Sequence, residues 1–117
     1  MDNIQTKPLA VVERYDQFIN YIYPITQNIP RKHGCFRDSL LENLLNVPDK
    51  IYEAAKSNQV GKVNNLDSAL AALRWKLRFA VHHDRKLITR HQHEVASVHL
   101  AEVGKMVGAW RNKFNKR

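Results

Sequence analysis

Five histidines lie close together in the sequence, and their side chains have the widest range of possible chemistry. They are His82, His83, His91, His93 and His99. Imidazole nitrogens bind Zn²⁺ and other transition metals when several of them converge on one point. His91 and His93 are two residues apart, so their side chains diverge on a helix, and the chain contains no Glu-x-x-His pair. We therefore predict no metal site and no cofactor, and we interpret the histidines as part of a basic surface that gains charge below neutral pH.

The sequence lacks the residue patterns that support nucleophilic catalysis. It contains no Gly-rich phosphate loop, no Gly-x-Ser-x-Gly turn and no Cys–His pair at the start of a helix. The single cysteine, Cys35, cannot form an internal disulfide, and we expect it to be a small buried residue. The sequence thus predicts a protein that is not an enzyme.

Net charge is the bulk property that says most about possible ligands. The 117 residues include 19 Lys and Arg against 11 Asp and Glu, which gives a net charge of +8. Residues 1–65 hold eight basic and seven acidic side chains, whereas residues 66–117 hold eleven and four. A basic surface of this kind is typical of proteins that bind polyanions. No signal peptide is evident and no apolar run reaches the roughly 18 residues of a membrane span, so we expect a cytoplasmic protein without a membrane partner.

Helical periodicity runs through four segments, and no alternating strand pattern is present. The first predicted helix begins at Leu9, is kinked at Pro24 and stops at Pro30. The second follows a short polar connection, bends beside Pro48 and ends near Lys56.

The third predicted helix follows the most loop-like stretch of the chain, residues 57–65. Asp67 or Ser68 is its expected N-cap. The fourth runs to Phe114, with Thr89 as a possible cap. Its apolar side chains recur at helical spacing and form a core-facing stripe. That stripe consists of Ala96, Leu100, Val103, Val107, Trp110 and Phe114.

Four amphipathic helices with short connections favour an all-α fold, an antiparallel four-helix bundle with up-down-up-down topology. We predict a single domain over residues 1–117, in which residues 1–8 form a frayed lead-in. Helical spacing from the third helix onward also predicts a basic ridge along one edge. The ridge consists of Arg74, Arg78, His82 and Arg85.

Two surfaces indicate close packing or contact with another subunit. Trp75 and Phe79 lie nearly opposite the core stripe of the third helix, which fits either an irregular bundle or a subunit interface. In the fourth helix, small residues line up beside the core stripe, and they allow close packing within the bundle or between subunits. They are Ser97, Ala101, Gly104 and Gly108. For an oligomer or partner interface, the candidates are Trp75, Phe79, Ala101, Gly104 and Gly108.

Several segments, spread over nearly the whole chain from about Val11, resemble one protein family. They are Ile29-Pro30-Arg31-Lys32, Leu44–Ala55, Leu73-Arg74 and Val103-Gly104-Lys105-Met106-Val107-Gly108-Ala109-Trp110. Together they are similar to the accessory variability determinant proteins of diversity-generating retroelements. These proteins belong to a wider four-helix-bundle family that includes proteins encoded in 23S ribosomal RNA intervening sequences.

This resemblance implies a homopentameric, barrel-like assembly with a positively charged surface. It also implies binding to a retroelement reverse transcriptase and to RNA or DNA during mutagenic retrohoming, without catalysis. Helix geometry then offers the basic positions for phosphate contacts, which are Arg74, Arg78, His82, Arg85, Lys86, Arg90, Lys105 and Arg111. The alternative is a structural or interaction bundle of the intervening-sequence type, without a reverse-transcriptase partner.

Overall fold

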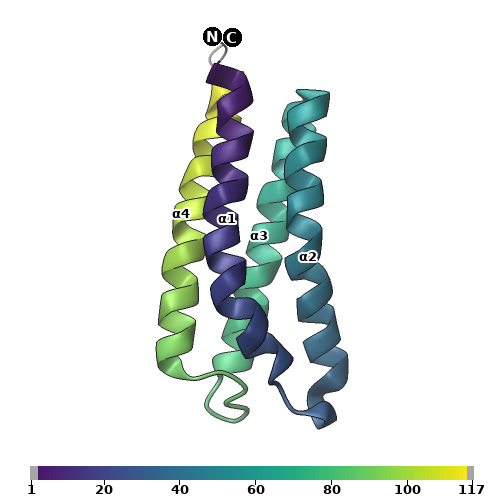
Figure 1. Cartoon of the computed structure of the whole chain (residues 1–117), viewed down its shortest axis with the longest axis vertical. Coiled ribbons are helices and arrows are strands. Elements are labelled where there is room, and N and C mark those ends of the chain that lie inside the picture. The colour runs from purple at the N-terminus through teal and green to yellow at the C-terminus, as the bar shows by residue number, and fades with distance from the viewer. Residues whose placement is uncertain (1–2, 116–117) are drawn as a thin grey trace.

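The computed structural model describes the backbone of residues 3–115 and the side chains of residues 9–114. Within this range the chain forms four long α-helices and no strand. The helices are α1 (Asn3–Gln27), α2 (Gly34–Ser57), α3 (Val60–Val81) and α4 (Arg90–Asn115). Each helix packs against the helices that precede and follow it, and α4 packs against α1. Figure 1 shows the four helices running alternately up and down, so the predicted antiparallel four-helix bundle is confirmed.

Two helices begin earlier than the sequence suggested. The first starts at Asn3 rather than at Leu9, and residues 1–2 of the expected lead-in lie outside the described residues. The prediction of a loop over residues 57–65 is wrong, because α3 already begins at Val60. Val63 is fully buried and lies one turn before the buried stripe of α3, so its burial outweighs the polar composition around it. That stripe consists of Leu66, Leu70, Leu73, Leu77 and Ala80.

A two-residue connection, Asn58 and Gln59, therefore joins α2 to α3. Asn58 has φ 53° and ψ 39°, the left-handed conformation that ends many helices, and its amide donates to the carbonyl of Ala54. Asp67 lies inside α3 and is not its cap. The expected cap of α4 is confirmed, since the amide of Gln92 donates to the Thr89 hydroxyl while the Thr89 amide donates to the Gln92 side chain.

One hydrophobic core runs along the bundle, and all four helices contribute to it. The largest fully buried side chains are Tyr15, Phe18, Ile22, Ile29, Leu40, Leu44, Ile51, Leu66, Leu70, Leu73, Leu77 and Leu100. The predicted core stripe of α4 is buried from Ala96 to Trp110, and Phe114 packs against it while partly exposed. Cys35 is exposed at the start of α2, so the expectation that it is buried is wrong. The next residue, Phe36, packs against the hydrophobic core instead of Cys35.

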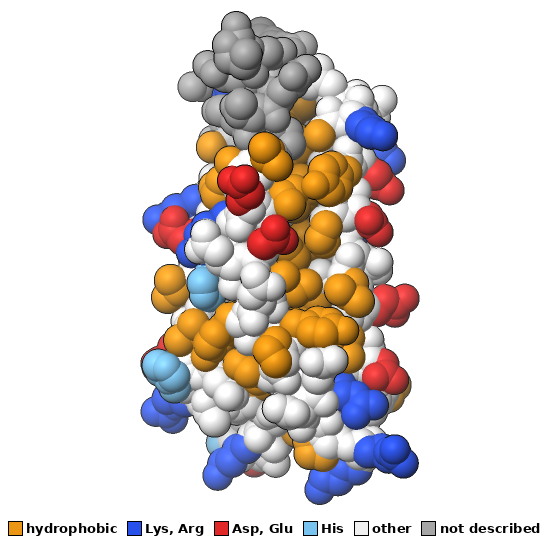
Figure 2. Space-filling view, in the orientation of Figure 1, with side chains coloured by type: hydrophobic (Ala, Val, Ile, Leu, Met, Phe, Trp, Pro, Cys, Tyr) orange, Lys and Arg blue, Asp and Glu red, His pale blue; other side chains and the backbone are white. Residues whose placement is uncertain are grey.

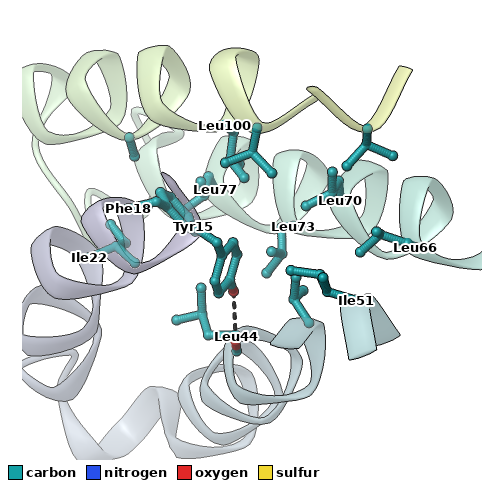
Figure 3. Packing of buried hydrophobic residues seen from close by; sticks show 14 of the residues in the cluster. Tyr15, Phe18, Ile22, Leu44, Ile51, Leu66, Leu70, Leu73, Leu77 and Leu100 are labelled. Atoms are coloured by element: carbon teal, nitrogen blue, oxygen red, sulfur yellow. Dashed lines mark hydrogen bonds between the residues drawn. The ribbon is translucent and has the colours of Figure 1, made fainter. Parts of the chain in front are cut away.

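Tyr15 solves a problem that Pro48 creates in α2. In a regular helix the carbonyl of Leu44 accepts the amide hydrogen of residue 48, but proline has none. Leu44 is fully buried, so water cannot pair with its carbonyl. The Tyr15 hydroxyl donates to this carbonyl across the bundle at 2.6 Å (Figure 3). Burial raises the pKa of Tyr15 well above its usual range, so the hydroxyl remains a donor.

Pro24 leaves the carbonyl of Asn20 without a helical donor in the same way. Both residues are exposed, however, so water can pair with that carbonyl. Helix α1 continues past Pro24 and ends at Gln27, before Pro30. A proline in this bundle therefore needs a partner only where the freed carbonyl is buried.

Removal of the Tyr15 hydroxyl should destabilise the fold. Tyr15→Phe leaves the buried Leu44 carbonyl unpaired, so we expect the free energy of unfolding in urea to fall by about 1–3 kcal/mol. Pro48→Ala supplies an amide hydrogen to the same carbonyl, and the decrease caused by Tyr15→Phe should be smaller in that background. A decrease of the same size in the parent and in the Pro48→Ala background would show that the hydroxyl does not serve this carbonyl.

Candidate nucleic-acid interface

A groove of about 300 Å³ lies between α3 and α4. It is lined by Arg74, Leu77, Arg78, His93, Ser97, Leu100 and Ala101. Leu77 and Leu100 are buried and make its floor apolar, while Arg74 and Arg78 place two guanidinium groups along it. Among the side chains of residues 9–114, neither arginine has an ion-pair partner. The α3–α4 groove therefore offers uncompensated positive charge beside an apolar floor.

Two of the four small residues on α4, Ser97 and Ala101, line this groove. A Cβ atom on Gly104 would lie 2.6 Å from a terminal nitrogen of Arg74, so the missing side chain gives the guanidinium its place. A Cβ atom on Gly108 would have no neighbour within 4 Å. Among the described residues, Gly104 thus makes room for the Arg74 side chain and Gly108 faces open space. Neither glycine packs against the backbone of a neighbouring helix.

The predicted basic ridge of four residues is wrong as a single helical line. Helix α3 ends at Val81, and His82 leaves it with φ −52° and ψ 138°. Only Arg74 and Arg78 share the edge of α3, because the chain beyond Val81 no longer follows the helical spacing.

The connection after α3 instead brings three polar side chains together. The ring of His82 stacks on that of His83 at a centroid distance of 4.4 Å, and both rings lie near the carboxylate of Asp84. Their potential metal-ligand atoms all lie within 4.8 Å of one another. Arg85 and Lys86 follow directly, and their positive charge opposes the binding of a cation here.

Arg85 lies on the aromatic side of α3 and does not line the groove. Its Nε donates to the carbonyl of Phe79 at 2.8 Å, and its guanidinium lies 3.7 Å from the centroid of the Phe79 ring. This geometry is a cation–π contact, which fixes the side chain of Arg85 against the bundle.

The other candidate basic residues fall into two groups. Lys86 and Arg90 line a second pocket, of about 260 Å³, at the start of α4. Lys105 and Arg111 each lie beside a carboxylate: Lys105 Nζ is 3.4 Å from Glu102, and Arg111 Nη1 is 3.3 Å from Asp67. The structure thus brings together Arg74 with Arg78, and Lys86 with Arg90.

The residues expected at an interface occupy different environments. Phe79 stacks on Phe36 at 4.7 Å and is covered by Arg85, whereas Trp75 is 53% exposed. Ala101 is exposed and lines the groove, Gly104 lies beside the Arg74 guanidinium, and Gly108 faces open space.

An apolar surface between α1 and α2 was not predicted from the sequence. Leu45 and Tyr52 are each about half exposed, and a pocket of about 270 Å³ lies where Leu45 meets Ile19 and Tyr23. Figure 2 shows hydrophobic side chains gathered between these two helices, with acidic side chains beside them. We call this surface the α1–α2 face. The signal was present in the sequence, since Leu45 and Tyr52 are seven residues apart and lie on one helical side outside the core stripe.

His99 is separated from the other histidines and belongs to the contact between α1 and α4. Its Nδ1 lies 2.8 Å from a guanidinium nitrogen of Arg14, and its ring lies 6.0 Å from that of Tyr21. Since arginine can only donate, Nδ1 must accept this hydrogen bond. Burial lowers the pKa of His99, and the positive charge of Arg14 lowers that pKa further.

A family model described as bAvd-like matches residues 9–114 of the chain. No curated protein matches the sequence significantly. In the part of the chain that the structure describes, no helix combines the length and the apolarity needed to cross a membrane. The family match confirms the resemblance to accessory variability determinant proteins.

The lowered pKa of His99 predicts a loss of stability in mild acid. The unfolded chain binds a proton near the ordinary histidine pKa of about 6.5, whereas the folded chain binds it only at lower pH. The contribution of neutral His99 is therefore present above that value and lost as the pH falls. We expect the urea midpoint to decrease between about pH 7.5 and about pH 5, and to decrease less in His99→Gln, which keeps an acceptor for Arg14. An identical pH dependence in the variant would contradict this role.

Proposed function

Because the chain belongs to the bAvd-like family, we propose that it is a cytoplasmic, non-catalytic accessory protein that binds nucleic acid and partners a retroelement reverse transcriptase in mutagenic retrohoming. The observation that carries the nucleic-acid part is the α3–α4 groove, which is lined by Arg74 and Arg78, neither of which has a carboxylate partner among residues 9–114. The proposal of a reverse-transcriptase partner rests on the family resemblance alone.

Phosphate neutralisation is the proposed mode of binding. Guanidinium groups bind phosphate oxygens through paired N–H donors, and each contact releases a counterion from the nucleic acid. Such contacts position a strand without reading its sequence. Lys86 and Arg90 extend the positive charge toward the connection between α3 and α4. Sequence selection then rests with the partner enzyme.

Self-association is the second part of the proposal, and the family resemblance makes the assembly a homopentamer. We assign the subunit contact to the α1–α2 face, whose occupant is a second copy of the chain. Leu45 and Tyr52 expose about half of their surface there, and burial of such side chains between subunits stabilises an assembly. The contact leaves the α3–α4 groove free for nucleic acid.

Charge reversal in the groove tests the nucleic-acid part. Arg74→Glu with Arg78→Glu should weaken the binding of RNA and DNA alike, and it should flatten the dependence of log K on log salt by roughly 0.7–0.9 for each phosphate that is no longer neutralised. Fluorescence anisotropy with labelled oligonucleotides measures both quantities. Lys50→Glu with Lys56→Glu on α2 is the matched control, because it changes the net charge equally at another site.

Binding by the groove variant that equals the parent's binding, with the same salt dependence, would remove the physical basis of this proposal. A decrease of equal size in the α2 control would show that net charge matters and the groove does not. Either outcome would reject the groove as the binding site. If the parent binds neither RNA nor DNA, the basic half of the chain is a solvated face, and a structural bundle of the intervening-sequence type becomes the better description.

Light scattering tests the assembly. Leu45→Glu with Tyr52→Glu places two charges on the α1–α2 face, so the molar mass measured by multi-angle light scattering should fall while the helix signal in circular dichroism is retained. Val98→Glu is the control, since Val98 is 62% exposed on α4. A parent protein that is monomeric at tens of micromolar, a concentration order at which specific interfaces form, would refute the assembly.

A further inference from the structure

Trp75 is an exposed aromatic side chain with basic residues near it, and it lies outside the α3–α4 groove. Its side chain is 53% exposed on the outer side of α3. Arg78 follows one turn later on the same side of α3, and Arg74 precedes Trp75 directly in the sequence, so the three side chains leave α3 within about one turn of the helix. Trp75 does not line the α3–α4 groove, whereas both arginines do.

Neighbouring aromatic side chains hold Trp75 from one side. Its ring lies 5.5 Å from that of Phe79. Phe79 is fixed in turn, because it stacks on Phe36 and is covered by the guanidinium of Arg85. Trp75 therefore rests against a packed aromatic cluster while about half of its surface faces solvent.

The surroundings of Trp75 differ from those of an apolar contact surface. Its other neighbours one turn away on α3 are Ala71 and Ala72, which are small and exposed, and Arg78. Apolar side chains on the surface gather instead on the α1–α2 face. A flat aromatic ring among arginines and small residues suits a ligand that has its own aromatic face and negative charge.

We propose that Trp75 stacks on an unpaired base of a nucleic-acid strand whose adjacent phosphates are bound by Arg74 and Arg78. This inference rests on the proposed function and names its ligand class, which is single-stranded nucleic acid. In a duplex the bases are stacked on one another and paired, so their faces are not accessible to a side chain. In a single strand every base offers a face, and stacking on an aromatic side chain adds affinity with little regard to sequence.

The chain contains a built-in reporter for this contact. Of its two tryptophans, Trp75 is exposed and Trp110 is 6% exposed in the core. A base that stacks on Trp75 should quench the exposed component of the tryptophan fluorescence. Titration of the parent protein with a short oligouridine should therefore quench the emission, and titration with duplex RNA of the same length should quench it much less.

Substitution of Trp75 separates stacking from charge. Trp75→Leu keeps an apolar side chain but removes the ring, so the affinity for oligouridine should fall by about 5- to 150-fold while the affinity for the duplex stays within about twofold. Trp75→Phe keeps a smaller ring and should recover part of the single-strand affinity. Circular dichroism checks that both variants retain their helix content.

Three outcomes would overturn the inference. If Trp75→Leu binds oligouridine as tightly as the parent, the ring does not contact bases. The proposed nucleic-acid function would then still be tested by the charge reversal at Arg74 and Arg78, which does not depend on Trp75. If Trp75→Leu lowers the molar mass in light scattering, Trp75 belongs to a subunit contact. If the parent binds neither oligouridine nor duplex, the inference and the proposed nucleic-acid function fail together.

Discussion

The bundle depends on the pairing of one buried carbonyl. Pro48 removes the amide that would serve Leu44, and the Tyr15 hydroxyl replaces that amide from the neighbouring helix. Because a hydrogen bond has a narrow range of distance and angle, this contact fixes the height and rotation of α1 against α2. Phe18 and Ile22 follow Tyr15 on the same side of α1 and are fully buried, so the register set at Tyr15 also orders the core below it.

Helices α3 and α4 have a different role in the bundle, because they hold two arginines beside an apolar groove. Side chains larger than hydrogen at Gly104 would occupy the volume that the Arg74 guanidinium takes. The helix accepts the lower propensity of glycine there, at roughly 1 kcal/mol relative to alanine. Thus α1 and α2 present an apolar face, α3 and α4 present a basic one, and the two surfaces can serve different partners.

Much of the fold followed from periodicity, because buried stripes such as Ala96 to Trp110 repeat at helical spacing whatever their context. The start of α3 did not follow, since Val63 is one apolar residue in a polar stretch and only tertiary burial shows its role. The groove arginines could be predicted from their spacing within one helix. Arg85 could not, because its place depends on where α3 ends and on a contact with the Phe79 ring. The spacing of Leu45 and Tyr52 is visible in the sequence, but their union with Ile19 and Tyr23 into the α1–α2 face depends on how the two helices pack.

The short connection at Asn58 and Gln59 also bears on the order of folding. A loop of two residues loses little entropy on closure, whereas the contact between α1 and α4 joins segments separated by most of the chain. Helices α2 and α3 can therefore pair first, with Asn58 already in the conformation that ends one helix before the next begins. On this route α1 docks onto a preformed hairpin, and the Leu44 carbonyl stays open to water until Tyr15 arrives.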